Sequence, residues 1–276
     1  MDKNRVSIVT SINKRFFESE YQTLVQDMRE KYPDVPFYIY HENSYEEKNF
    51  GQSIDLSLLE RENVHLIDLH TCWDEEWLED FVDGPDSPFA PMEGVATTHS
   101  NYWKRHSKFW FRKVAAEYHC AFNECETPIM IWMDSDTRFK KDMDNKIMDF
   151  IYNYDICYIA RTLKMQGWTV DQVRTESGFV TYDITNPWVR DVLQQVMNLY
   201  KDRTIFKSWR WDDCEALDTV LKTDISDSLK LGYFNNPHSG KTENVSSFNI
   251  YGYIGHYLKM RQVRKAEPKR IKHGNS

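Results

Sequence analysis

The stretch Ile129-Met130-Ile131-Trp132-Met133-Asp134-Ser135-Asp136 decides the fold predicted for this chain. Its apolar part is typical of a β-strand buried on both faces, and two carboxylates follow that strand. In open α/β sheets ligands bind beyond the carboxyl ends of the strands, so Asp134 and Asp136 are predicted to lie in a ligand crevice. A divalent cation relieves the repulsion between such carboxylates, and Mg²⁺ or Mn²⁺ suits oxygen ligands and a substrate diphosphate. The alternative is an ordinary exposed Asp-Ser-Asp turn.

Apolar runs of strand length alternate with helical spacings along the rest of the chain, which predicts βαβ units. Strands are expected at residues 5–10, 36–41, 64–69, 128–133, 155–160 and 179–182, and helices at 17–32, 101–118 and 187–200. Residues 71–98 hold a Gly-Pro-Asp-Ser-Pro cluster and are expected to form an irregular surface excursion, a lid or substrate loop.

The composition is that of a folded protein. The chain has 276 residues, of which 41% are hydrophobic and 28% charged, with only 10 Gly and 9 Pro. No linker-like stretch divides residues 1–258, so one continuous domain is expected there. No apolar run approaches the roughly 20 residues that span a bilayer, no export signal is visible, and the five cysteines form no CxxC pair. A soluble, cytoplasmic protein with reduced thiols is predicted.

The net charge of −8 is unevenly distributed. Residues 259–276 form a basic tail, in which seven Lys or Arg stand against one Glu, so the body is more acidic than the whole chain. An acidic body argues against nucleic-acid binding as the main function. The tail is either a frayed, solvated terminus or an electrostatic arm, and the second interpretation predicts peripheral contact with an anionic membrane.

Several segments spread over most of the chain together carry a resemblance. They are Thr10-Ser11-Ile12-Asn13, the helix with Lys104, Arg112 and Lys113, Met133-Asp134-Ser135-Asp136, Thr175-Glu176-Ser177-Gly178-Phe179, Trp211-Asp212-Asp213 and Gly255-His256-Tyr257-Leu258-Lys259. In these the chain resembles the DxD glycosyltransferases of the GT-A fold, particularly small bacterial, phage and giant-virus members. The resemblance implies an α/β fold with a mostly parallel central sheet flanked by helices. It also implies a nucleotide-sugar-binding half at about 1–140 and an acceptor-binding half at 141–258.

The same resemblance implies roles for individual residues. The metal, Mn²⁺ or Mg²⁺, would be held by Asp134, Asp136 and a late histidine, for which His256 is favoured over His238. Lys259 would meet a phosphate, although Met260 and Arg261 stand where the family often has a glycine. The nucleotide-sugar donor would contact Thr10, Asn13, Arg112, Lys113, Asp134, Ser135, Asp136, Glu176, Gly178 and Lys259. For Lys113 the alternative is a lysine whose stem is buried and whose head reaches water, and for Glu176 an ordinary loop acid.

The resemblance also makes Asp213 the candidate catalytic base, because glycosyl transfer by inversion needs a carboxylate to take the proton from the acceptor hydroxyl. Helix capping explains the same residues equally well, with Asp212 as the N-cap and Asp213 as a first-turn acid. The predicted function is metal-dependent transfer of a sugar from a nucleotide-sugar, with UDP-sugars favoured, to a hydroxyl of a glycan or lipid-linked acceptor.

Three other classes of protein fit parts of the pattern. A haloacid-dehalogenase-type phosphatase also begins its motif with an apolar strand and Asp-x-Asp, but it requires Thr or Val where this chain has Arg138. A nucleotidyltransferase would need a glycine-rich loop, and residues 10–15 contain no glycine. A catalytically inactive carbohydrate-binding protein with a transferase fold would bind sugar without metal.

Overall fold

The computed structural model describes residues 1–14, 17, 22–73, 77–96, 98, 101–165, 168–234 and 247–256. Its centre is a mixed, mostly parallel eight-stranded sheet in the order β3-β2-β1-β4-β7-β6-β8-β9. Only β7 runs against its two neighbours. The strands are β1 Val6–Ser11, β2 Phe37–His41, β3 Val64–Asp68, β4 Ile129–Met133, β6 Ile156–Met165, β7 Trp168–Asp183, β8 Leu231–Phe234 and β9 Ser247–Phe248.

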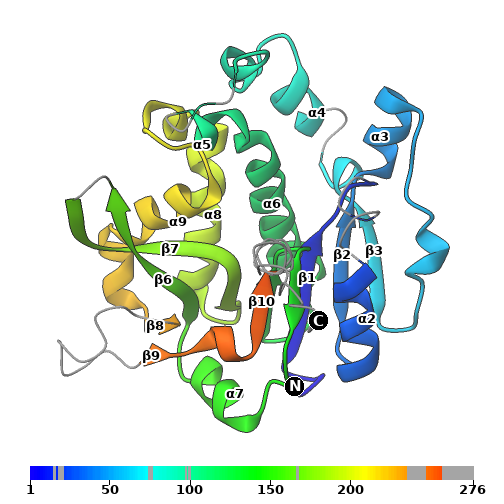
Figure 1. Ribbon diagram of the computed structural model, residues 1–276, viewed down its shortest axis with the longest axis vertical. Coiled ribbons are helices and arrows are strands. Elements are labelled where there is room, and N and C mark those ends of the chain that lie inside the picture. The colour runs from blue at the N-terminus through cyan, green and yellow to red at the C-terminus, as the bar shows by residue number, and fades with distance from the viewer. Residues whose placement is uncertain are drawn as a thin grey trace, which may run out of the picture.

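Helices cover both faces of this sheet (Figure 1). One face packs against α4, α6, α8 and α9, and the other against α2 and α7, each with its own hydrophobic cluster. The alternation along β4 explains this, because Met130 and Trp132 enter one cluster and Ile131 and Met133 the other. The helices are α2 Gln22–Lys31, α3 Asn43–Phe50, α4 Trp77–Asp83, α5 Tyr102–Arg105, α6 Ser107–His119, α7 Asn145–Tyr152, α8 Pro187–Lys201 and α9 Asp213–Leu221.

A short antiparallel pair stands apart from the main sheet. It joins β5 (Thr137–Phe139), which follows the acidic motif directly, to β10 (Ile254–His256) near the end of the described chain. In its register His256 lies opposite Thr137. Two segments more than a hundred residues apart in the sequence therefore meet beside Asp136.

The structure corrects three details of the predicted elements. The strand expected at 179–182 is the end of the sixteen-residue β7, whose first part pairs with the ten-residue β6. The single helix expected at 101–118 is divided at His106 into α5 and α6. The expected irregular excursion contains the helix α4, whose Leu78 and Val82 are buried in the core.

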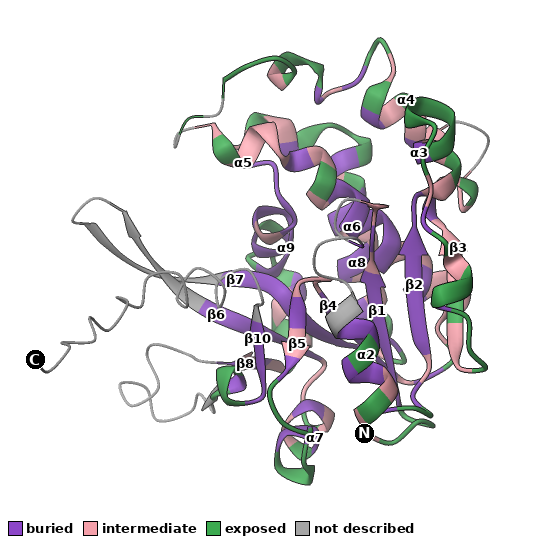
Figure 2. Cartoon of the chain, turned by 45° about the vertical axis from the view of Figure 1, so that its right-hand side comes forward, coloured by how far each residue is buried: buried purple, intermediate pink, exposed green. Residues whose placement is uncertain are grey.

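Burial follows the layers of the fold. The strands β1, β2 and β4 are buried almost throughout, whereas α3, above one edge of the sheet, is mostly exposed (Figure 2). Among the described residues, no helix has both the length and the apolar character needed to cross a membrane.

Candidate functional site

The site lies at the point where the order in which successive strands are added to the sheet reverses. The chain passes from β1 to β2 and β3 on one side, and β4 then enters on the other side of β1. Because β1 and β4 are parallel neighbours, with Val9 opposite Trp132, the loops after both strands meet at one edge. Such a switch point is the general ligand site of open α/β sheets.

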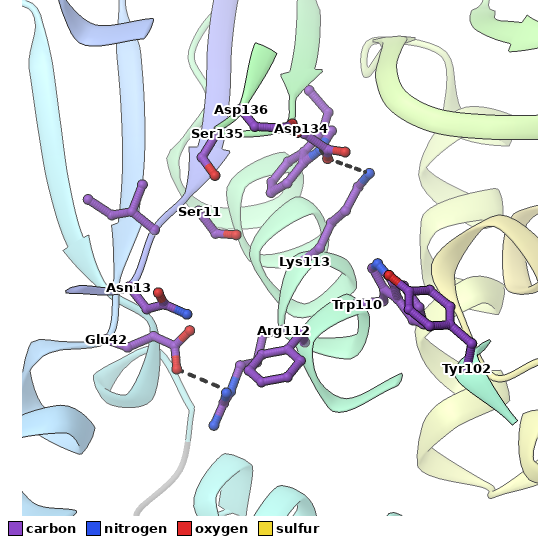
Figure 3. Close-up of a pocket in the computed structure, with 13 residues that line it drawn as sticks. Ser11, Asn13, Glu42, Tyr102, Trp110, Arg112, Lys113, Asp134, Ser135 and Asp136 are labelled. Atoms are coloured by element: carbon purple, nitrogen blue, oxygen red, sulfur yellow. Dashed lines mark hydrogen bonds and ion pairs between the residues drawn. The ribbon is translucent and has the colours of Figure 1, made fainter. Parts of the chain in front are cut away.

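A pocket of about 300 Å³ opens at this edge (Figure 3). Asp134, Ser135 and Asp136 line it at the end of β4, and Ser11, Ile12 and Asn13 line it at the end of β1. The other lining residues are Glu42, Tyr102, Phe109, Trp110, Arg112, Lys113 and Trp132. The strand-end argument therefore places the acidic motif in a crevice, as predicted.

Asp134 is fixed by hydrogen bonds from both its side chain and its backbone. Its Oδ1 accepts from the indole N–H of Trp132 at 2.8 Å and from Lys113 Nζ at 3.1 Å. Its backbone N–H donates to the carbonyl of Gly178 on β7 at 3.0 Å. The side chain of Asp134 is still 37% exposed, so the carboxylate is both oriented by protein groups and open to the pocket.

Lys113 links the acidic motif to the predicted base. Its Nζ lies 3.1 Å from Asp134 Oδ1 and 2.9 Å from Asp213 Oδ2, and it donates to the carbonyl of Ser177. Burial alone would lower the pKa of Lys113, but the two carboxylates outweigh this and raise it above its usual value. Lys113 is thus a buried, charged lysine with anionic partners, and its head does not reach out to bulk water.

Asp212 and Asp213 have different partners. Asp212 is the N-cap of α9, accepting from the backbone N–H of Glu215 at 2.9 Å, and it pairs with Arg210 at 2.6 Å. Asp213 begins the helix itself, is buried, and accepts from Ser177 Oγ at 2.5 Å in addition to its pairing with Lys113. The capping interpretation is confirmed for Asp212, while Asp213 faces the lysine that also holds the acidic motif.

Glu117 is a further buried acid that the sequence reasoning missed. It lies one helical turn after Lys113 on α6 and borders a small internal cavity together with Asp213, Ser177 and Tyr182. Its Oε1 has no hydrogen-bond partner among the described residues. Burial raises the pKa of Glu117 to about 8, against the lowering effect of Lys113. At neutral pH this side chain is therefore protonated.

Arg112 belongs to a second charged group at the pocket. Its Nε lies 3.1 Å from Glu42 Oε2, and its Nη2 lies 3.5 Å from Asp83 Oδ2 on α4. Burial opposes the charge of Arg112, but Glu42 and the neighbouring groups more than compensate and raise its pKa. Glu42 follows the end of β2, so the strand-end argument applied to that strand would have found it.

The remaining predicted donor residues fall in different places. Asn13 lines the pocket, whereas Thr10 is fully buried within β1 and its hydroxyl has no hydrogen-bond partner among the described residues. Glu176 lies on β7, buried, and accepts from the hydroxyl of Tyr251 at 2.9 Å. Gly178, also on β7, contributes the carbonyl that holds Asp134.

Of the late residues, the described chain includes only His256, through its backbone. The pairing of β10 with β5 brings it to the residue that follows Asp136. The predicted phosphate contact Lys259, the alternative ligand His238 and the basic tail lie outside the described residues.

A second group of possible metal ligands lies at the start of α9. Within the described part of the chain, ligand atoms of Asp212, Asp213 and Cys214 lie within 4.8 Å of one another. Each carboxylate is already bound by protein groups, and burial raises the pKa of the Cys214 thiol well above its usual range. A protonated thiol is a poor ligand, so this group fits a cation less well than Asp134 and Asp136 do.

Among known proteins, similarity to this chain is found in solved structures and not in sequence. No protein-family model matches the chain, and no curated protein matches it in sequence. The mannosyltransferase Ktr4p from S. cerevisiae is similar in structure, with a TM-score of 0.50 at 9% identity over 84% of this chain and 68% of that one. Ktr4p in complex with GDP gives the same TM-score and identity over 84% and 69% of the two chains.

A third similar structure is the core-mannan synthase A from Aspergillus fumigatus in its Mn/GDP form, with a TM-score of 0.48 at 11% identity over 83% of this chain and 72% of that one. Together with the sheet order and the pocket at its switch point, the likeness to Ktr4p establishes the fold: this chain has the GT-A fold of glycosyltransferase structures.

Proposed function

We propose that this protein is a metal-dependent glycosyltransferase that moves a sugar from a nucleotide-sugar to a hydroxyl of a glycan or lipid-linked acceptor. One observation carries the proposal. The pocket at the switch point between β1 and β4 combines the carboxylates of Asp134 and Asp136 with the buried cations of Arg112 and Lys113. This combination suits a diphosphate that is neutralised partly by a cation and partly by protein.

The donor end of the pocket is polar. Ser11, Asn13, Glu42 and Arg112 lie on one side of Lys113, and Ser135 and Asp136 lie at the end of the neighbouring strand (Figure 3). Side-chain hydroxyl, amide and carboxylate groups of this kind can hydrogen-bond a ribose and a base. All the lining residues fall within residues 1–140, in keeping with a nucleotide-binding half there. The sequence resemblance favours uridine, while the similar Ktr4p has been solved with GDP.

The residues fit a divalent cation. Two carboxylates that line one pocket are the oxygen donors that Mn²⁺ and Mg²⁺ prefer, and the backbone of His256 pairs opposite Thr137, the residue after Asp136. The cation would stabilise negative charge on the departing diphosphate. We propose Asp134, Asp136 and His256 as its protein ligands.

Asp213 is the proposed base that takes the acceptor proton. Ser177 Oγ and Lys113 Nζ both contact its Oδ2, so the carboxylate is held in one orientation. Lys113 also balances the charges of Asp213 and Asp134. In this proposal Lys113 is shared between the donor side and the acceptor side of the reaction.

Calorimetric titration with UDP and GDP, each with Mn²⁺ and again with EDTA, tests the proposal. We expect one nucleotide to bind in the presence of metal and binding to be lost with EDTA. Asp136→Asn should weaken this binding by at least tenfold and abolish transfer, because it removes a negatively charged ligand. Asp142→Asn is the matched control, since Asp142 is nearby in sequence and its side chain is 76% exposed. Failure of both nucleotides to bind, or normal turnover by Asp136→Asn, would contradict the proposal.

A further inference from the structure

A strip of aromatic side chains leads from the pocket to the outer surface. It consists of Trp110 and Tyr102, which line the pocket, then Trp103, and finally Trp209 in the loop before α9. The ring centroids of Trp110 and Trp103 are 5.5 Å apart, and those of Trp103 and Tyr102 are 5.2 Å apart. Tyr102 and Trp209 are each 43% exposed. We refer to these four residues as the aromatic strip.

Two rings of the strip, those of Trp103 and Trp209, contact a buried cation. The guanidinium of Arg210 lies 4.2 Å from the ring centroid of Trp103 and 5.4 Å from that of Trp209. Arg210 is itself buried and paired with Asp212, the N-cap of α9. Cation–π contacts and a buried ion pair therefore fix Trp103 and Trp209 before any ligand arrives. They also fix the strip relative to Asp213, the next residue along α9.

The strip lies on the side of the pocket away from the polar groups. Figure 3 shows Tyr102 and Trp110 across Lys113 from Asn13 and Glu42. Exposed aromatic rings that continue a pocket onto the surface indicate a ligand with apolar faces. The C–H faces of pyranose rings pack on flat aromatic rings, whereas a diphosphate requires the cations and acids of the opposite side.

We propose that the aromatic strip is the binding site for the saccharide acceptor, with Trp110 and Tyr102 at the reacting end and Trp209 at the outer end. This inference rests on the proposed function and adds the position and chemistry of the acceptor site. It also moves part of acceptor recognition into residues 102–110, although the sequence predicts an acceptor-binding half only at 141–258. A site that extends from Trp110 to Trp209 suits a chain of sugars better than a single one.

The test compares saccharide binding by Trp209→Ala and Trp103→Ala with binding by Trp188→Ala. Trp188 is the matched control because it is 48% exposed and lies far from the strip. It stands at the start of α8, just after the end of β7. That end of β7 pairs with the first residue of β4, so Trp188 lies at the opposite edge of the sheet from the pocket. The probes are lactose, α-1,6-mannobiose and maltotetraose, titrated into each protein and followed by saturation-transfer NMR. UDP and GDP with Mn²⁺ are titrated in parallel.

We expect at least one saccharide to bind the unmodified protein, and each strip substitution to weaken it about threefold to tenfold. Trp188→Ala should bind like the unmodified protein. Thermal unfolding checks that each variant is folded, and the exposed Trp209 provides a usable variant if Trp103→Ala does not fold.

Three results would overturn the inference. The first is that no saccharide probe binds, and the second is that the strip variants bind saccharide as well as the control does. The third is that the strip variants lose nucleotide binding but keep saccharide binding, which would assign the strip to the base of the donor. Strip-dependent saccharide binding without any nucleotide binding would leave the inference standing while contradicting the proposed transferase function.

Discussion

Glu117→Gln is predicted to stabilise the protein increasingly as the pH rises from 5 to 8. Burial raises the pKa of Glu117 in the folded protein to about 8, whereas in the unfolded chain it has its ordinary value of 4.5. Between these values the folded state keeps a proton that the unfolded state has released. The free energy of unfolding therefore falls as pH rises, by about 1.4 kcal/mol per pH unit, until the folded state also loses the proton.

Glutamine has the same shape and stays neutral at every pH, so the variant lacks this loss. At pH 7, about 2.5 units above the ordinary pKa, the free energy of unfolding of the variant should exceed that of the unmodified protein by about 3 kcal/mol. The difference should be small near pH 5 and level off above pH 8.

Urea unfolding of both proteins at pH 5, 6, 7 and 8 measures this difference. Glu126→Gln is the control, because Glu126 is exposed and the same substitution there removes no buried carboxyl group. Parallel stability curves for Glu117→Gln and the unmodified protein would show that Glu117 is ionised in the folded state, and would refute the reasoning from its burial.

The other predictions concern a buried cation, a tightly packed glycine and the basic tail. Lys113→Met should lower the free energy of unfolding by about 3–5 kcal/mol, since it leaves the buried carboxylate of Asp213 without its charged partner. Lys48→Met, at a surface pair in which the lysine is 57% exposed, should cost less than about 1 kcal/mol, and equal effects in urea unfolding would contradict this assignment. Gly232→Ala should lower the melting temperature and reduce the free energy of unfolding by about 1–3 kcal/mol, because a Cβ there would lie 2.7 Å from the sulfur of Cys157. An unchanged melting temperature would show that β6 shifts to accommodate the methyl group without strain. Removal of residues 261–276 should abolish co-sedimentation with phosphatidylserine vesicles, and equal sedimentation of both chains would exclude the tail as a membrane contact.

Several elements could be predicted from local pattern because the pattern is itself the cause. The continuous apolar run 129–133 can be satisfied only by a strand covered on both faces, and the sheet places hydrophobic clusters on both sides of it. Asn186 followed by Pro187 predicts a helix start, and Asn186 caps α8 by accepting from the backbone N–H of Trp188. The motif that follows β4 lines the pocket for the same local reason, since it occupies the end of a parallel strand.

The length of β7 could not be predicted in this way. Its first part is held by backbone hydrogen bonds to β6, and hydrogen bonding between strands depends on a partner rather than on the side-chain pattern of one segment. The pairing of β5 with β10 is a similar case, because each strand has three residues and carries too little pattern to be recognised alone.

By itself the sequence determined the α/β class, the buried central strand and the presence of two carboxylates at its end, since periodicity, helix caps and strand ends act over a few neighbouring residues. Only the tertiary structure decided that Lys113 lies between Asp134 and Asp213, that Glu117 is buried beside them and that Arg210 orders the aromatic strip. The physical reason is that charge pairing and desolvation depend on distances between residues far apart in the chain. The packing of α6 against β1 and α9 sets those distances.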